Sequence, residues 1–302
     1  MVTILNADAP NPRGSVSPSD AVNYTSTFMQ QLVNDWVSQD GRQVAYSALE
    51  QSPFYMRDFQ EFHSLLKTVD PARMQEVKRK TFFINLFNLL SIDAILSLDS
   101  LPQNILNVTE FWRSYSYQVG PYTFHLDDIL HGVLRGNRPH STSGDVMFAS
   151  DDPRRILKLP ADHRVLSVVT CSALSCPPRA SYFASDLDRK LDTSMANLCR
   201  DGVKSTSNSI IINSFFKWFR SDFGATEQDV LRFLATCSDD PVKSSALRAA
   251  ADGSRNYTYS FDWTFDNLSL TDIFQAPFLI RCRDNCRGNG VLNNSDVKDD
   301  TN

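Results

Sequence analysis

Residues 82–90, FFINLFNLL, constrain the fold of this chain more than any other stretch. Seven of the nine side chains are apolar, which predicts a helix buried in the core. Asn85 and Asn88 interrupt the apolar run, and their spacing of three places both amides on one face of that helix. A buried amide costs free energy unless its donors and acceptors find partners. We therefore expect both asparagines to bind specific groups.

The composition is that of an ordinary globular protein. The chain has 302 residues, of which 42% are hydrophobic and 22% are charged, and that length suits one large domain. The formal net charge of −5 gives no electrostatic attraction to nucleic acid or to an anionic membrane. We therefore expect neither as a partner.

The sequence carries no evident targeting or membrane segment. The N-terminus lacks a basic start followed by an apolar run, as a signal peptide would have. No apolar stretch reaches the roughly 18–20 residues that a membrane span needs. Six cysteines are few for a disulfide scaffold in a chain of this length, and none forms a CxxC pair. These features favour a cytoplasmic location.

Apolar spacing and turn residues predict the order of elements. We expect a flexible leader over residues 1–16, a single domain over 17–286 and a disordered tail over 287–302. Helices are predicted over about 20–39, 53–68, 71–98, 127–135, 184–200, 213–222, 226–237 and 242–252. A hairpin over 115–126, a buried strand over 164–170, a loop over 171–178, and strands over 209–212 and 257–263 complete the order. Helices dominate, which predicts an α+β fold with a small mixed or antiparallel sheet.

The loop after the predicted buried strand holds the strongest chemical candidate. Cys171 ends that strand, and the small residues after it leave backbone amides that suit an oxyanion hole beside a nucleophilic thiol. His131 could serve as its base if the fold brings the two together. The alternative is that Cys171 is a small buried filler and Cys176 packs the turn. Spacing alone leaves both alternatives open.

The other polar candidates are less specific. Asn85 and Asn88 could orient a catalytic imidazole, but amides also bind loop carbonyls with no chemistry involved. No metal site is expected, because the histidines and cysteines show no recognised ligand spacing and His125 and His131 lie six residues apart across a helix start. No phosphate-binding or dinucleotide-binding motif is present, so we expect no cofactor.

Five segments follow one another in a familiar order: KTFFINLFNLLSIDAIL, HLDDILHGVLR, RVLSVVTCSALSCPP, FFKWFRSDFG and YSFDWTFDN. Over about residues 40–268 the chain thereby resembles the domain of unknown function 547 family. The resemblance implies a site like those of papain-like or transglutaminase-like thiol enzymes. Matched residue by residue, the family's polar positions are Asn85, Asn88, His131, Arg135, Arg164, Cys171, Ser175, Cys176, Asp222, Asp262 and Trp263.

The chain also departs from the family pattern at positions near these residues. Leu130 stands in place of a glutamate, Leu166 in place of a histidine, and Thr170 in place of an asparagine. Ser172 stands in place of a glycine. These changes suit either a narrower substrate or a member that has lost catalysis and kept the fold.

Two hypotheses of function follow. In the first, the protein is a thiol-dependent hydrolase or acyl transferase acting on a peptide, amide or ester, with Cys171 as nucleophile and His131 as base. Asn85 or Asn88 would face these two groups and orient the imidazole. In the second, the protein is a non-catalytic module that binds a small ligand or a partner protein. The residues expected to bind or pack around the substrate are Arg135, Arg164, Ser175 and Cys176.

The two loop cysteines are expected to differ. Cys171 precedes free backbone amides, which predicts a depressed pKa for its thiol. Cys176 precedes Pro177, which has no N–H to donate, so we expect Cys176 to pack or to pair. The oxidation state of the Cys171–Cys176 and Cys282–Cys286 pairs is left open by the sequence.

Overall fold

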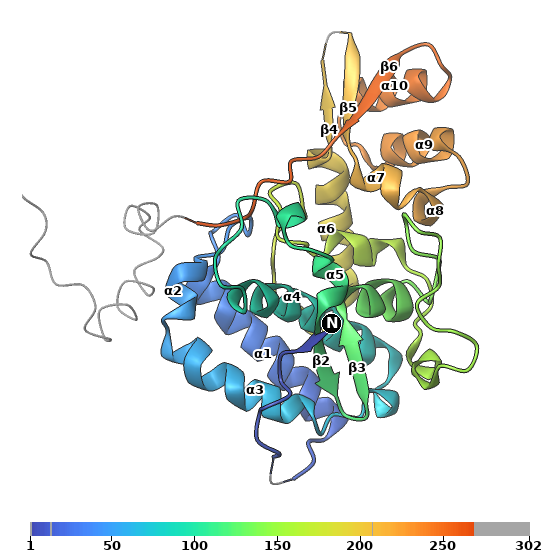
Figure 1. Ribbon diagram of the computed structural model, residues 1–302. Coiled ribbons are helices and arrows are strands. Elements are labelled where there is room, and N and C mark those ends of the chain that lie inside the picture. Colours follow the sequence, from blue (N-terminus) through green and yellow to red (C-terminus); the bar gives the residue numbers. More distant parts are fainter. Residues whose placement is uncertain (1, 13, 207, 269–302) are drawn as a thin grey trace, which may run out of the picture.

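A computed structural model describes residues 2–268 apart from 13 and 207 (Figure 1). The expected tail over 287–302 and the Cys282–Cys286 pair lie outside the described residues. The architecture is α+β, as expected: helices surround a central helix, α4, and two small sheets lie at the edges. None of the helices in the described part of the chain combines the length and the apolar run that a bilayer span requires.

The central helix, α4, contains the FFINLFNLL segment. α4 spans Glu76–Leu96, and every residue from Thr81 to Leu96 is buried. A helix that is apolar on all sides must be enclosed by other elements. α1 (Pro18–Trp36), β2 (Tyr115–Val119) and the π-helix η4 (Asp128–Leu134) pack around it. Asp70 caps only a short 3₁₀ turn at Pro71–Arg73, so the predicted helix over 71–98 begins later than expected.

The predicted flexible leader is wrong for the residues that the structure describes. β1 (Thr3–Ile4) pairs in parallel with β2, and the fully buried Asn6 binds the backbone of Gln118 with both its oxygen and its nitrogen. Two carbonyls of the segment also accept hydrogen bonds from Lys67. Sequence reasoning missed this packing because its contacts are polar and long-range.

Two three-stranded mixed sheets replace the one small sheet expected. β2 pairs antiparallel with β3 (Tyr122–His125), which confirms the predicted hairpin. In the second sheet, β5 (Ser209–Asn213) lies between β4 (Val203–Ser205) and β6 (Asn256–Ser260). Further helices are α2 (Tyr46–Glu50), α3 (Phe59–Leu66), α5 (Phe111–Ser114), α6 (Leu187–Asp201), α7 (Phe215–Trp218), α8 (Arg220–Phe223), α9 (Glu227–Cys237) and α10 (Pro241–Ala251).

The predicted strand over 164–170 is wrong. Residues His163–Ser167 form a 3₁₀ helix that begins after a cap by Asp162, and residues 168–170 pair with no strand. The segment is as buried as a strand of that composition would be. Its backbone groups are bound by a side chain of α4 instead of a neighbouring strand, as the site below describes.

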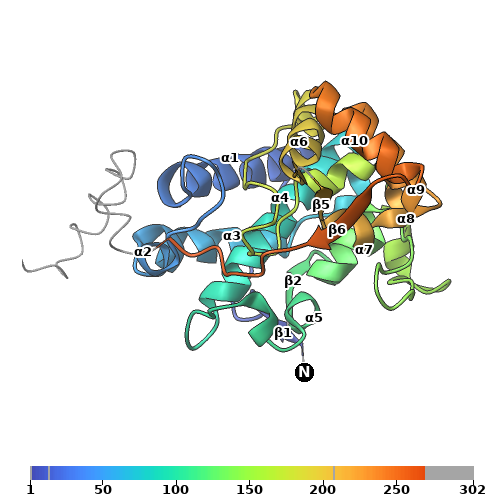
Figure 2. The same cartoon turned by 90° about the horizontal axis from the view of Figure 1, so that it is seen from above.

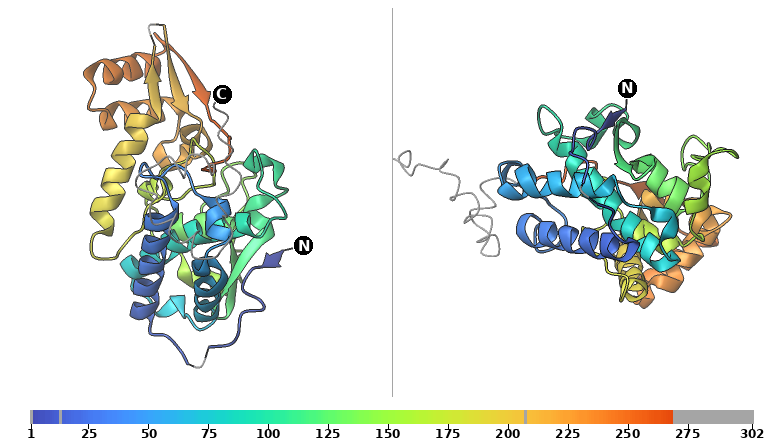
Figure 3. Two further views of the ribbon diagram at one scale, coloured as in Figure 1. Left: turned by 90° about the vertical axis from the view of Figure 1, so that its left-hand side faces the viewer. Right: turned by 90° about the horizontal axis from the view of Figure 1, so that it is seen from below.

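Residues 261–268 form a strap that runs from β6 at one end of the molecule back towards α2 (Figures 1 and 2). The strap crosses the loop over 171–176, where its backbone binds the amides of Leu174 and Ser175 and the carbonyl of Ser172. Viewed from the side, the second sheet stands with α9 and α10 at the end of the molecule away from α1 and α3 (Figure 3). The strap therefore joins the two ends over the candidate site.

Candidate functional site

A cavity of about 350 Å³ brings together side chains from several separate parts of the chain, Phe87 of α4 among them. Its thiol wall is the loop over 171–176, and its opposite polar wall comes from η4 and the turn that follows it. Aromatic rings from α7, the strap and residue 112 complete the lining. The residues that carry its chemistry are Asp127, His131, His140, Cys171 and Cys176.

Asn88 fixes the chain just before the thiol loop. Its Nδ2 donates to the Val168 carbonyl at 2.8 Å, and its Oδ1 accepts the Thr170 N–H at 3.1 Å. The side chain thereby supplies the backbone partners that a neighbouring strand would otherwise supply. Asn88 positions the loop and binds no imidazole.

Asn85 lies one helical turn away and serves a different segment. It clamps both backbone groups of Tyr182, at 2.8 and 3.0 Å, and its Nδ2 also donates to Ser26 and to the Thr81 carbonyl. With these bonds its amide is fully engaged by residues outside the cavity that holds His131 and Cys171. The expectation that both asparagines face those groups is therefore wrong for Asn85. Its role is structural.

The thiol loop is wrapped around the sulfur of Cys176. The backbone N–H of Cys171 points at Cys176 Sγ at 3.3 Å, and the N–H of Ala173 and the S–H of Cys171 also donate to it. Between these two amides, Ser172 has a φ of 60°, in the left-handed region. Successive amides around such a residue form an anion-binding nest. The family pattern has a glycine where this chain has Ser172, and glycine adopts a positive φ without strain.

A buried ionic network holds this loop from behind. Arg179 pairs with Asp266 of the strap at 2.9 Å, and donates to Ser172 Oγ at 2.7 Å and to Ser91 Oγ at 3.0 Å. Tyr46 adds a hydrogen bond to Asp266 at 3.0 Å. Sequence reasoning missed both Arg179 and Asp266, because a single charged residue carries no signal of burial until its partner, far along the chain, is known.

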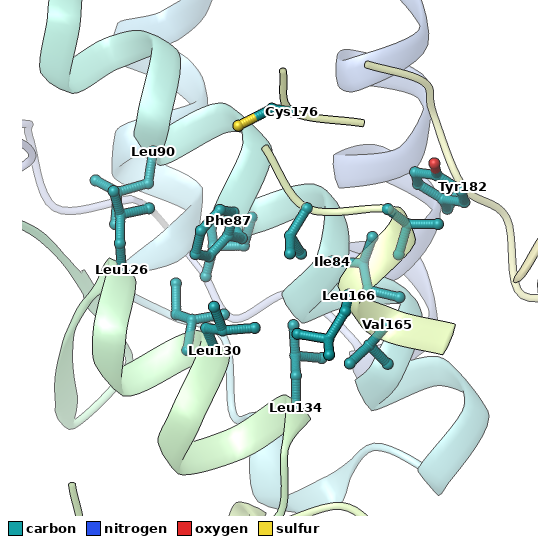
Figure 4. Close-up of a cluster of buried hydrophobic side chains, with 14 of the residues drawn as sticks. Ile84, Phe87, Leu90, Leu126, Leu130, Leu134, Val165, Leu166, Cys176 and Tyr182 are labelled. Atoms are coloured by element: carbon teal, nitrogen blue, oxygen red, sulfur yellow. The ribbon is translucent and has the colours of Figure 1, made fainter. Parts of the chain in front are cut away.

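The acidity of the two loop thiols is the reverse of the expectation. Burial raises the pKa of Cys176, but the hydrogen bonds donated by Cys171 and Ala173 outweigh that and lower its pKa below the usual value. The hydrogen bond that Cys171 donates to Cys176, together with burial, raises the pKa of Cys171. A thiolate in this loop is therefore stabilised on Cys176. The sulfur of Cys176 points towards Phe87 and Leu90 of α4 (Figure 4).

His131 cannot act as the expected base. Its Nδ1 accepts a hydrogen bond from the guanidinium of Arg135, which is itself held by Asp222 with Nε–Oδ1 at 3.2 Å. Burial and the neighbouring Arg135 lower the pKa of His131 to about 2. Because Nδ1 is an acceptor, the neutral ring carries its proton on Nε2, which lies 3.9 Å from Asp127 Oδ1. His131 is thus a neutral hydrogen-bond donor.

Asp127, His131 and His140 form a three-residue cluster that the sequence did not reveal, with ligand-type atoms all within 4.8 Å of one another. Asp127 occupies the N-cap position at the start of η4, His131 lies four residues later within it, and His140 follows the turn after η4. Nδ1 of His140 accepts the N–H groups of Thr142 and Ser143, so this neutral ring also carries its proton on Nε2, 3.5 Å from Asp127 Oδ2.

That hydrogen bonding does not suit a metal ion. A histidine that binds a metal offers one bare nitrogen and donates its other N–H to an acceptor. In this cluster the Nδ1 atoms of both rings accept hydrogen bonds, and Asp127 is already paired with Arg113 at 2.8 Å. Burial lowers the pKa of His140 as well, with the positive charges of Arg113 and Arg135 opposing its protonation. The cluster presents two N–H donors and a carboxylate.

Arg135, Arg164 and Ser175, which were also expected to bind the substrate, do not line this cavity. Arg135 supports His131 from behind, as described. Arg164 pairs with Asp162, Asp188 and Asp192, and so ties its 3₁₀ helix to α6. Ser175 Oγ accepts the N–H of Asp262 at 2.8 Å and anchors the strap. Ser175 and Cys176 also line a second, more polar cavity of about 590 Å³ on the other side of the loop.

An aromatic wall faces the thiols. Trp263 of the strap lies 4.5 Å from Phe261, 5.3 Å from Trp218 and 6.3 Å from Trp112, measured between ring centroids. The helical spacing of FFKWFRSDF favours a core role ahead of a ligand site, but its Trp218 is only partly buried and lines the cavity. Of the departures from the family pattern, Leu130 and Thr170 also line it, and Leu166 lies in the core (Figure 4).

Comparison with known proteins agrees with the resemblance seen in the sequence. No curated protein and no solved structure matches the chain. The model of a family described as "Protein of unknown function, DUF547" matches residues 71–197, a range that contains Asn88, the His131 cluster and both loop thiols but not Trp218 or Trp263. Residues 71–197 thus identify the chain as one that carries a domain of the DUF547 family.

Proposed function

We propose that the protein is a thiol-dependent acyl transferase or hydrolase in which Cys176 is the nucleophile. One observation carries the proposal: Cys176 Sγ accepts the Cys171 N–H at 3.3 Å and lines an apolar cavity. Reactive cysteines are found where fixed donors lower the thiol pKa and a cavity gives access to substrate. This assignment moves the nucleophile from Cys171 to its neighbour.

The imidazoles of the cavity serve as donors in this proposal. Both neutral rings carry a proton on Nε2, so the N–H of His131 suits stabilisation of the oxyanion that develops on a substrate carbonyl. The donors around Cys176 lower its thiol pKa and so reduce the need for an imidazole base.

The same imidazoles restrict the leaving group. Expulsion of an amine requires a general acid, and the lowered pKa of His131, about 2, leaves no imidazolium there at neutral pH. A thiol, with a pKa of about 8.5, leaves without protonation. We therefore propose thioesters, and esters of acidic alcohols such as phenols, as substrates, ahead of the amides and peptides that the sequence left open. The aromatic wall around Trp263 suits an aromatic or aliphatic acyl group.

The test is acylation of the protein by a matched pair of substrates, a phenylacetyl thioester and the corresponding anilide. We expect intact mass spectrometry to find one acyl group on the thioester-treated protein, placed on Cys176 by peptide mapping, and none from the anilide. Cys176→Ser should lose the adduct, and Cys171→Ser and Cys237→Ser should keep it. An adduct on Cys171, or none on any cysteine, contradicts the proposal.

A second candidate is a non-catalytic module that binds an apolar or aromatic ligand. It is favoured by the absence of an available imidazole base in the described part of the cavity, where Nδ1 of His131 and Nδ1 of His140 both accept hydrogen bonds. Trp112, Trp218 and Trp263 line the cavity and report on its occupation. Ligand-dependent quenching of tryptophan fluorescence that survives Cys176→Ala, with no acylation of the wild type, supports this second function.

A further inference from the structure

The two loop thiols touch each other as well as the cavity. Cys171 and Cys176 are five residues apart, the S–H of Cys171 donates to Cys176 Sγ, and its N–H does the same at 3.3 Å. The loop that joins them is held by Asn88 on one side and by the Arg179–Asp266 pair on the other. Both sulfurs are reduced in this structure.

We propose that Cys171 and Cys176 form a peroxide-reactive dithiol, in which Cys176 reacts first and Cys171 then closes an intramolecular disulfide. The proposal goes beyond acyl transfer, because it needs neither a substrate carbonyl nor a turnover. It assigns different roles to two thiols that line the same wall of the cavity.

The chemistry balances with hydrogen peroxide as the oxidant. The Cys176 thiolate attacks one peroxide oxygen, the O–O bond breaks, and the departing hydroxide takes up a proton to give water and a sulfenic acid. The sulfur of Cys171 then attacks the Cys176 sulfur, an S–S bond forms, the S–O bond breaks, and a second water leaves with the Cys171 proton. Two thiols are oxidised and one peroxide is reduced to two waters.

Geometry selects both the oxidant and the order of events. Cys176 is only 4% exposed, so a small neutral oxidant reaches it through the cavity more readily than a bulky disulfide does. Its Sγ accepts the N–H of Cys171 at 3.3 Å and that of Ala173, and these donors stabilise the thiolate that peroxide attacks. Cys171 keeps its proton and is already in contact with the sulfur it must attack, so the sulfenic acid is resolved before further oxidation.

The experiment follows the oxidation of the full-length protein and two variants by mass spectrometry, with no acyl substrate present. In the wild type, substoichiometric peroxide should produce a peptide in which residues 171 and 176 are joined, restored to two thiols by dithiothreitol. Cys171→Ser should instead accumulate a sulfenic acid on Cys176 that dimedone traps. Cys176→Ser should lose the reaction, with Cys171 oxidised at least ~10-fold more slowly than Cys176 in the wild type.

Controls separate this proposal from a folding defect and from the proposed enzyme. Each variant's melting temperature is compared with that of the wild type, and the wild-type result stands if a variant does not fold. A dimedone adduct on Cys171 in the wild type, or no 171–176 disulfide before Cys199 and Cys237 react, overturns the proposal. A protein that forms the disulfide but accepts no acyl group leaves the dithiol intact and rejects the acyl transferase.

Discussion

Two pairs of thiols in this protein look alike by acidity and differ in what surrounds them. Cys171 and Cys176 share one loop on the cavity wall, whereas Cys199 of α6 and Cys237 at the end of α9 meet across two helices. In both pairs one pKa is raised and one is lowered. Hydrogen bonds from Cys199 and from the Thr236 hydroxyl lower the pKa of Cys237 to about 7, even though partial burial opposes this.

The difference lies in how rigidly the donors are held. The donors to Cys176 include backbone amides of a loop that Asn88, Arg179 and Asp266 fix from three elements. The donors to Cys237 are two side chains, and neither Cys199 nor Cys237 lines the cavity. A perturbed pKa therefore does not distinguish the pairs; the fixed amides and the cavity do. That contrast is the basis for assigning chemistry to the first pair alone.

The largest effect should come from breaking the buried Arg179–Asp266 ion pair, which supports the loop that holds Cys171 and Cys176. Arg179→Ala leaves the Asp266 carboxylate buried without its cation, and both side chains are 1–2% exposed. We expect the free energy of unfolding to fall by about 3–5 kcal/mol. Urea denaturation measures it. Arg200→Ala, which removes an exposed ion pair with Asp201 beside the other thiol pair, should change stability by less than about 0.5 kcal/mol. Equal losses of stability in the two variants would mean that the buried Arg179–Asp266 pair contributes no more than an exposed ion pair.

Separate substitution of Asn88 and Asn85 of α4 distinguishes a loss of stability from a loss of thiol reactivity. Asn88→Ala leaves the Val168 carbonyl and the Thr170 N–H without partners, and should cost about 1–3 kcal/mol. Asn85→Ala, with similar losses at Tyr182, is the matched control and should cost about the same. Only Asn88→Ala should abolish the preference of iodoacetamide for Cys176 over Cys171. A loss of that preference in both variants would show that it depends on general stability.

Substitution of Ser172 tests the nest itself. Ser172→Ala and Ser172→Gly both remove the hydroxyl that Arg179 binds, but only glycine adopts a φ of 60° without strain. We expect the glycine variant to be more stable than the alanine variant by about 1 kcal/mol in thermal unfolding. The glycine variant should also keep the low pKa of Cys176, as measured by the pH dependence of thiol labelling. If the two variants unfold alike, the left-handed backbone is not required for the loop.

The smallest effect should come from the thiols between α6 and α9, Cys199 and Cys237, and this effect depends on pH. Because the pKa of Cys237 is lowered on folding, its contribution to stability is present above the unfolded thiol pKa and is lost as pH falls through about 7. The stability difference between wild type and Cys237→Ser should therefore grow from about pH 6 to about pH 9, by less than about 1 kcal/mol because the thiol is half exposed. A difference that shrinks over this range would contradict the assignment of the thiolate to Cys237.

Local patterns in the sequence determined most of the elements of this fold. The helical apolar spacing of α4, the Gly120–Pro121 hairpin and the order of later helices were all recoverable, because each depends on residues close in the chain. Two local predictions were wrong. The segment over 164–170 has the composition of a strand but finds its backbone partner in Asn88, and the described leader is held by polar contacts such as those of Asn6.

Only the tertiary structure decided the chemistry of the site. The sequence placed Cys171, Cys176 and His131 among the candidates, but the order of the two thiol pKa values depends on which amides point at which sulfur. The state of His131 depends on Arg135 and Asp222, the latter 87 residues further along than the former. Burial and hydrogen bonding set a pKa through space, and neither is encoded in the spacing of residues along the chain.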